Sequence, residues 1–268
     1  MRSHLLTVVV TVLLFTSCAT LSRNGVGRVK YYTIESERLP KEFNGFTFAF
    51  LSDTHYPSKF TRKRLGRLVR KLRESQPQMV LLGGDYVTSD EYANELFDSI
   101  SSVKTPHGIY AVLGNHEFSR TSLIKERMEQ YGIYLLDDKH VNINNGASYI
   151  AVAGVHNPFK VDENYLYKTN SLSDSLFTIL LSHTPDYAED TDVQADIVLS
   201  GHTHGGQVSL FGLYTPVTNS RYETRFNRGL NYTDASVPVI TTTGVGTSRR
   251  KVRFCVPSEI VFVRLLSL

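Results

Sequence analysis

Acidic, imidazole and amide side chains recur where apolar runs of this 268-residue sequence end. They occur in the segments SDTH, GGD, GNHE, LSH and GHTH, at Asp53, His55, Asp85, Asn115, His116, His183, His202 and His204. Carboxylate, imidazole and amide oxygen are borderline-to-hard metal ligands, and no cysteine thiolate accompanies them. Such a set favours Mn²⁺, Fe or Zn²⁺ in a reactive site over a structural zinc, which is usually held by cysteines.

The number of candidate ligands predicts two ions and not one. A single tetrahedral ion needs four ligands, whereas two ions about 3.5–4 Å apart, sharing a bridging carboxylate, match a two-metal hydrolytic site. Asp53 and His55 are two residues apart, so an extended backbone would direct both side chains toward one ion. His202 and His204 have the same spacing, and we expect them to bind different, neighbouring ions.

The elements that must position these residues are read from hydrophobic patterning. Apolar runs predict strands within 46–53, 78–85, 108–117, 148–155, 176–183, 196–204, 237–244 and 259–266. Helical spacing predicts helices over 62–75 and near 122–131. Continuous apolar strands alternating with helices indicate an α/β domain, from about 29 to 268, whose sheet is covered on both faces. In such sheets, sites lie beyond the carboxyl ends of the strands, where the polar residues occur.

Taken together and in order, these motifs resemble the calcineurin-like metallophosphoesterase superfamily. The segments GHTHGGQ and GVGTS…RF…PSEI (244–260) resemble a branch of small, exported or membrane-associated phosphodiesterases, including some that act on UDP-diacylglucosamine-type lipid precursors. The resemblance implies a four-layer α/β sandwich of two packed mixed β-sheets flanked by helices. It also implies a dinuclear site with water as the nucleophile.

Carried over by position, the family pattern implies a role for each residue. It gives Asp53, His55 and His204 to the first metal, and Asn115, His183 and His202 to the second, with Asp85 bridging the two. The implied role of His116 is to protonate the leaving-group oxygen or to steady charge on the phosphoryl group. Glu117 would orient the His116 ring, although aspartate is commoner at its position.

The function expected from these features is hydrolysis of a phosphodiester or pyrophosphate bond by metal-bound hydroxide, with a lipid- or nucleotide-linked substrate. A phosphomonoesterase or phosphoprotein phosphatase is the alternative, and a non-catalytic metal-binding module is a further one. No serine–histidine or cysteine–histidine arrangement suggests a covalent intermediate. The formal charge of +3 is too small and too dispersed to imply a nucleic-acid partner, and we expect a monomer.

The first 18 residues predict export. Arg2 precedes an apolar run from Leu5 to Phe15, which is shorter than the roughly 20 residues of a membrane-spanning helix but fits a signal peptide. The segment LFTSC ends at Cys18 and resembles a bacterial lipoprotein signal, so we expect a lipidated Cys18, a tether over 19–28 and a membrane-anchored protein of the cell envelope. A plain signal peptide or an uncleaved anchor are the alternatives. Cys255 is the other cysteine, so no disulfide framework is predicted.

Four further features have two interpretations each. His156 either faces the substrate or is an ordinary loop residue, and the stretch 156–174 is either a cap or a surface excursion. The basic helix at 62–73 either presents a solvated face or is attracted to an anionic membrane. Arg221, Arg225 and Arg228 either belong to a solvated loop or bind a second phosphate or a head group.

Overall fold

The computed structural model describes residues 26–58, 60–156, 176–191, 193–211, 213–248 and 252–268. The predicted signal peptide with Cys18, most of the predicted tether, and nearly all of the stretch 156–174 lie outside these ranges. Within them, none of the helices combines the length and the apolar character needed to cross a bilayer.

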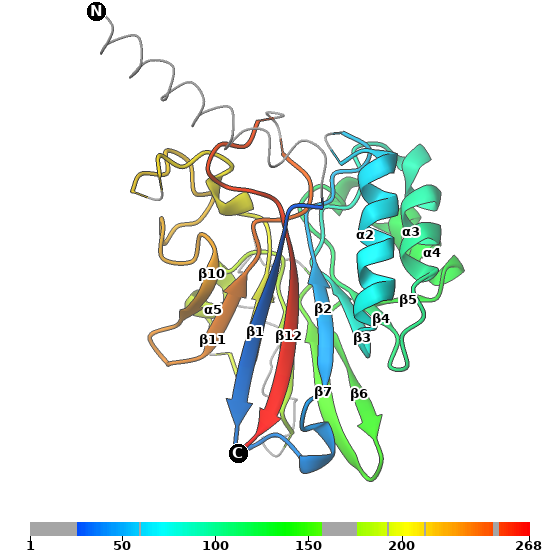
Figure 1. The fold of residues 1–268 in the computed structure, drawn as a ribbon, viewed down its shortest axis with the longest axis vertical. Helices are drawn as coiled ribbons and strands as arrows, with labels where there is room; N and C mark the ends of the chain where they lie inside the picture. Colours follow the sequence, from blue (N-terminus) through cyan, green and yellow to red (C-terminus); the bar gives the residue numbers. More distant parts are fainter. Residues whose placement is uncertain (1–25, 59, 157–175, 192, 212, 249–251) are drawn as a thin grey trace, which may run out of the picture.

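Two six-stranded mixed sheets form the centre of the molecule (Figure 1). The first has the order β1 (Arg28–Ser36), β12 (Glu259–Ser267), β2 (Thr47–Leu51), β3 (Met79–Leu82), β4 (Ile109–Ala111) and β5 (Ile133–Leu135). The second has the order β10 (Gly229–Tyr232), β11 (Pro238–Thr241), β9 (Ile197–Ser200), β8 (Thr178–Leu181), β7 (Ser148–Gly154) and β6 (Lys139–Asn145). The expected pair of mixed sheets is confirmed.

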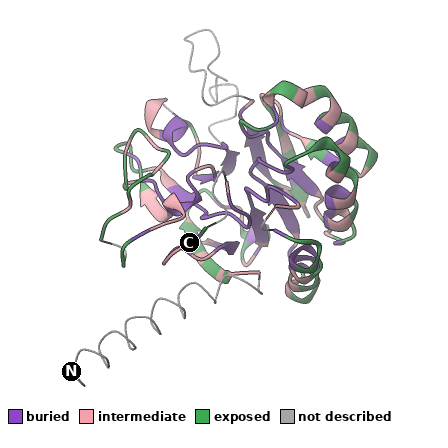
Figure 2. Ribbon diagram, turned by 90° about the horizontal axis from the view of Figure 1, so that it is seen from above, coloured by how far each residue is buried: buried purple, intermediate pink, exposed green. Residues whose placement is uncertain are grey.

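Helices cover the outer faces of the sheets, so that strands occupy the buried centre and helices the periphery (Figure 2). They are α2 (Arg62–Ser75), α3 (Ala93–Ser101), α4 (Thr121–Gln130) and α5 (Asp186–Asp190), with short 3-10 turns η1 (Lys41–Phe43), η2 (Asp90–Tyr92), η3 (Phe118–Arg120) and η5 (His204–Gly206). Helices α2, α3 and α4 pack on the first sheet, and α5 packs on the second. The result is the predicted four-layer sandwich.

Alternating side chains of single strands build two cores at once. In β2, Phe48 and Phe50 face the second sheet, whereas Ala49 and Leu51 face the helices. All four are buried, because both faces of this strand are covered. This double burial explains why the central strands read as unbroken apolar runs.

Parallel pairing brings the functional loops together. Strands β2, β3 and β4 run parallel in the first sheet, and β7, β8, β9 and β11 run parallel in the second. Their carboxyl ends meet at the upper end of the molecule in Figure 1. The motifs that follow β2, β3, β4, β8 and β9 therefore converge from both sheets on one place.

Candidate metal centre

The carboxylate of Asp85 lies at the middle of the cluster. Its Oδ2 atom is 3.5 Å from His55 Nε2, 3.5 Å from His183 Nε2 and 3.8 Å from His116 Nε2. Two groups of potential ligands, each with its ligand atoms within 4.8 Å of one another, share this residue. One group is Asp53, His55, Asp85 and His204, and the other is Asp85, His183 and His202. The shared residue is the one that the family pattern makes the bridge.

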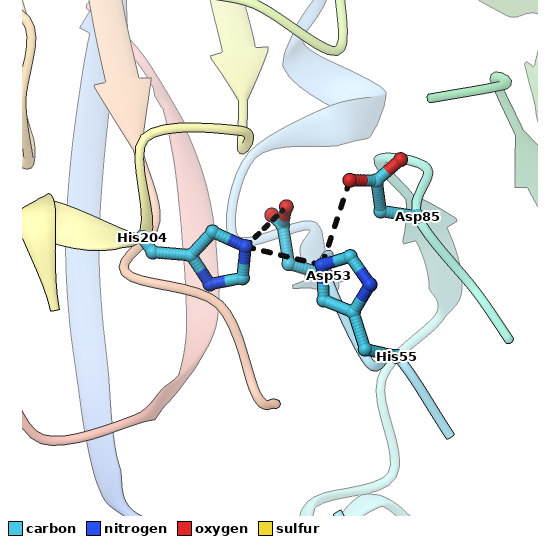
Figure 3. A group of neighbouring side chains, drawn as sticks. All are labelled: Asp53, His55, Asp85 and His204. Atoms are coloured by element: carbon cyan, nitrogen blue, oxygen red, sulfur yellow. Dashed lines mark hydrogen bonds and ion pairs between the residues drawn. The ribbon is translucent and has the colours of Figure 1, made fainter. Parts of the chain in front are cut away.

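Figure 3 shows how the first group faces inward. His204 Nε2 lies 3.3 Å from Asp53 Oδ1 and 3.1 Å from His55 Nε2. Asp53 also accepts the backbone N–H of His202, at 3.0 Å. Asp53, His55, Asp85 and His204 are buried, so these polar atoms turn toward one another and away from solvent.

The second group has a fixed histidine. His183 Nδ1 donates a hydrogen bond to the carbonyl of Gly83 at 2.6 Å. Because a carbonyl only accepts, Nδ1 keeps its proton, and Nε2 is the nitrogen left to face Asp85 and a metal ion. A hydrogen bond of this kind orients metal-binding histidines in general.

The backbone at the ligands is left-handed and not extended. Five of the seven predicted ligands have positive φ angles, between 40° and 66°: Asp53, His55, Asp85, His202 and His204. The expectation that Asp53 and His55 reach one ion from an extended segment is therefore wrong, although they do converge. Non-glycine residues rarely adopt this conformation, and such strain concentrates at functional sites.

Glycines permit the close approach of the loops. A Cβ atom added at Gly114 would lie 2.2 Å from Asp85 Oδ1, and one at Gly201 would lie 2.3 Å from Asp53 Oδ2. Real Cβ contacts are never this short. The glycines in GNHE and GHTH therefore leave room for the two carboxylates. In GGD, a Cβ at Gly84 would instead lie 2.5 Å from the Gly114 backbone nitrogen and 2.7 Å from His183 Nδ1.

Burial and neighbouring charge shift the titration of the cluster. Burial raises the pKa of Asp53 to about 6 and lowers the pKa of His55 to about 4 and that of His202 to about 3. Burial alone would lower the pKa of His183, but its charge interaction and hydrogen bond with Asp85 outweigh this and raise it to about 9. Burial opposes ionisation of Asp85 too, yet His183 and the other imidazoles hold its pKa well below its usual range.

The donor set fits two divalent cations. Two buried carboxylates and four imidazoles converge at distances longer than direct metal bonds, and positive charge at their centre would offset the repulsion between Asp53 and Asp85. All the donors are oxygen or nitrogen, which suits Mn²⁺, Fe or Zn²⁺. Asp53, His55, Asp85 and His204 would hold one ion, and Asp85, Asn115, His183 and His202 the other.

Two of the three remaining predicted residues, Asn115 and His116, lie at the mouth of the site. A cavity of about 590 Å³ covers the cluster, and Asn115 and His116 line it together with Asp85, His202 and His204. The His116 side chain is 41% exposed, unlike the buried ligands. Its backbone N–H donates to Asp85 Oδ1 at 3.0 Å, which fixes the GNHE loop against the central carboxylate.

The described contacts of Glu117 are with the backbone of two loops. Its buried carboxylate accepts the backbone N–H groups of Asp85 at 2.9 Å, Tyr86 at 3.0 Å and Gly114 at 2.9 Å. Its described hydrogen bonds thus join the ends of β3 and β4 and do not go to the His116 ring. Burial and the charge of Asp85 raise its pKa to about 7.

Arg253, for which the sequence predicted no role, contacts the metal-ligand candidate His204 from the protein interior. Its buried guanidinium donates to the carbonyls of His204 at 3.2 Å and Gly246 at 2.6 Å and lies 3.4 Å from His204 Nδ1. Burial lowers its pKa to about 10, so it stays charged at neutral pH. The one sequence signal for this role is that Arg253 belongs to the segment GVGTS…RF…PSEI, which resembles a branch of the family.

Several side chains for which the sequence left two interpretations open form ion pairs or hydrogen bonds in the structure. His156 pairs with Asp137. Arg221 pairs with Asp190, and Arg225 pairs with Glu189 and Asp234, which favours a structural role over a grip on phosphate. In α2, Arg64 is not part of a solvated face, because it is buried and donates to Val245 and Ser258.

Comparison with known proteins agrees with the family that the motifs resemble. The model of the calcineurin-like phosphoesterase family matches residues 46–206. The chain is 30% identical to the metallophosphoesterase YkuE of Bacillus subtilis, covering 88% of this chain and 84% of that protein. It is 29% identical to a metallophosphoesterase of Aquifex aeolicus, covering 89% and 91%. TT1561 of Thermus thermophilus, a solved structure, aligns with a TM-score of 0.49 at 11% identity, covering 75% of this chain and 91% of that one.

The family match, the fold and the converging donors lead to one conclusion: the chain belongs to the calcineurin-like phosphoesterase family and is a metal-dependent phosphohydrolase.

Proposed function

We propose that the protein hydrolyses a phosphodiester or pyrophosphate bond in a lipid- or nucleotide-linked substrate, outside the cytoplasm and at a membrane. The observation that carries the proposal is the pair of ligand groups that share Asp85 beneath an open cavity. Two divalent cations held there would supply charge to bind the phosphoryl group and activation of the attacking water.

His116 is the proposed proton donor. Its exposed ring lies at the cavity mouth, within 3.8 Å of the central carboxylate, where a leaving-group oxygen can reach it. As the new bond from water to phosphorus forms and the bond to the leaving group breaks, His116 gives its proton to the departing oxygen. Glu117 acts indirectly, by holding the backbone of the loop that bears His116.

The lining of the cavity supports an ester with a large substituent. Besides the polar cluster, the cavity is lined by the apolar side chains of Val208, Pro216, Val217 and Val252. A phosphoryl group at the cluster therefore places its substituent against apolar side chains. These apolar side chains favour a diester or pyrophosphate with an apolar or ring-bearing group over a small monoester.

Replacing His116 tests the mechanism. For His116→Ala we expect kcat on a soluble aryl phosphodiester to fall about 10²- to 10⁴-fold, since a general acid is lost, while the metal content stays unchanged. His140→Ala, at an exposed position on β6, is the matched control and should keep full activity. Unchanged turnover by His116→Ala with metal bound would contradict the assignment.

A substrate panel tests the bond type. Monoesters, diesters, a nucleotide-linked pyrophosphate and a lipid-linked pyrophosphate should be compared at equal metal loading. We expect the diester and pyrophosphate substrates to have the higher kcat/KM. A preference for monoesters would overturn the proposed bond type and leave the metal site intact.

A further inference from the structure

We propose that the surface beside the cavity docks on an anionic lipid bilayer, so that the cavity opens at the membrane. The surface is formed by the apolar tip, which we define as Leu210, Phe211, Leu213 and Tyr214. This inference rests on the proposed function for its choice of substrate, but docking itself is measured independently of hydrolysis.

The apolar tip is unusually exposed. The exposed fractions are 91% for Leu213, 70% for Phe211, 61% for Tyr214 and 47% for Leu210. Of the eleven exposed large hydrophobic side chains in the described part of the chain, these four and Val217 and Val252 belong to or flank this one surface. Apolar side chains gathered in this way mark an interaction surface, whereas single ones do not.

The tip is held in shape and is not a loose excursion. Leu210 N–H donates to the Tyr214 carbonyl at 2.8 Å, and Leu213 N–H donates to the Leu210 carbonyl at 3.0 Å. At the base, Ser209 N–H donates to the Phe254 carbonyl at 3.0 Å. These backbone hydrogen bonds fix the turn, and the four apolar side chains point outward from it.

An apolar path joins the tip to the cavity. Val208 precedes the tip, and Val217 follows it, and both line the cavity that contains His116 and Asp85. Val217 is also 56% exposed, so it belongs to the outer surface and to the cavity wall at once. A substrate with its apolar part in a bilayer can thus bring its phosphoryl group to the cluster without leaving the lipid.

Cations flank the tip and give the surface its preference for lipid over another apolar partner. Phe211 lines a second hollow of about 400 Å³ together with Arg28, Lys30 and Arg228. Arg28 and Lys30 are exposed. Glu259 also lines this hollow, but it is buried and accepts the Thr243 N–H. Exposed apolar groups with cations beside them match the interface of an anionic bilayer.

The N-terminal segment joins the domain at this same edge. Strand β1 runs parallel to β12, which runs antiparallel to β2, so Arg28 lies at the edge where β2 ends and the cluster begins. If Cys18 carries a lipid that is held in a bilayer, the seven residues 19–25 can span at most about 25 Å. A tether of that length favours docking of this edge over any other face.

A tryptophan reporter tests the docking in the full chain, which has no tryptophan of its own. The Phe211→Trp variant is mixed with vesicles of phosphatidylcholine and phosphatidylglycerol in equal parts, in which a fraction of the lipid carries bromine on its acyl chains. Tyr134→Trp, on β5 and 61% exposed, is the matched control. We expect bromolipid to quench the fluorescence of Phe211→Trp at least about twofold, with a blue shift that high salt reduces, and to leave that of Tyr134→Trp unaffected.

Two outcomes of the quenching experiment would overturn the proposal. A Phe211→Trp reporter as unquenched as the control shows that the tip stays in water. A blue shift that depends on protein concentration, without vesicles, assigns the tip to a second copy of the chain. Both variants are also assayed on the soluble aryl phosphodiester, where lost turnover would count against the metal centre and not against docking.

Discussion

At the scale of single residues, two buried groups hold protons where metal ions would bind. Asp53, with its pKa raised to about 6, is protonated below that pH in the metal-free protein. His183, with its pKa raised to about 9 through Asp85, carries a proton across the neutral range. Metal ligands must be deprotonated, so these protons compete with the cations.

Metal affinity should therefore rise with pH. Below pH 6 both Asp53 and His183 lose a proton on binding, between pH 6 and 9 only His183 does so, and above pH 9 neither does. We expect the number of protons released by the ligand side chains to fall from about two to about one and then to zero, in addition to the proton that a metal-activated water gives up at higher pH. Calorimetry in buffers of different ionisation enthalpy measures this number, and pH-independent release would contradict the assignment.

The types and order of the ligands could be predicted from sequence, because each follows an apolar run that ends at a recognisable motif. The backbone conformation could not, since nothing in SDTH announces that Asp53 and His55 have left-handed φ angles. The partners of Glu117 also escaped prediction. Its carboxylate binds backbone N–H groups 31 and 32 residues earlier, and such contacts leave no pattern in side-chain types.

At the scale of elements, the loops after parallel strands pack so closely that one methyl group should disrupt them. Gly114→Ala places a Cβ atom against Asp85 Oδ1 and the backbone nitrogen of Asp85. We expect the binding of both metals to weaken by at least about tenfold, because a shift of the bridging carboxylate costs more than about 1.4 kcal/mol. Metal titration, with circular dichroism to check folding, measures the effect.

Gly66→Ala is the matched control. Gly66 lies on the exposed face of α2, and no atom lies within 4 Å of an added Cβ. Alanine there should stabilise the protein by up to about 1 kcal/mol through helix propensity, with metal binding unchanged. If both alanines weaken metal binding equally, close packing at Gly114 is not the reason.

Some elements with clear patterning were predicted from the sequence, whereas two strands at the edges of the sheets were not. The expected helix 62–75 agrees with α2 at both ends, since its apolar residues keep helical spacing. Strands β1 and β6 were not predicted, because each has a single buried residue, Ile34 and Ile143, and neither forms an apolar run. Their pairing with β12 and β7 determines their conformation, and such pairing is not visible in a short stretch of sequence.

At the scale of the molecule, the candidate centre joins the two sheets. Loops of the first sheet supply Asp53, His55, Asp85 and Asn115, and loops of the second supply His183, His202 and His204. Neither sheet alone offers a complete set of donors for either ion. Bound metal would therefore resist separation of the sheets as well as serve the chemistry.

Metal should raise the melting temperature accordingly. Ligand present at about 100 times its dissociation constant adds about 2.7 kcal/mol to the free energy of unfolding. We expect a chelator to lower the Tm and added Mn²⁺ or Zn²⁺ to restore it, as followed by calorimetry. Asp85→Asn should abolish most of this difference. A Tm that is the same with and without metal would contradict a centre that joins the sheets.

The four-layer class could be predicted from the alternation of apolar strands and helices, whereas the assignment of strands to two sheets could not. Strand β1 pairs with β12, more than 200 residues later, and only the folded chain reveals that pairing.

The left-handed backbone at five of the candidate ligands lowers the stability of the fold in order to place groups that act in the chemistry. The five residues are Asp53, His55, Asp85, His202 and His204. Each costs about 1 kcal/mol or more relative to an ordinary backbone, which is a large share of what a protein of this size has to spare. Glycine would relax every one of them while removing the chemistry. An engineer wanting a hardier but inert scaffold, for instance as a carrier, would begin at the five positions that an enzymologist must leave alone.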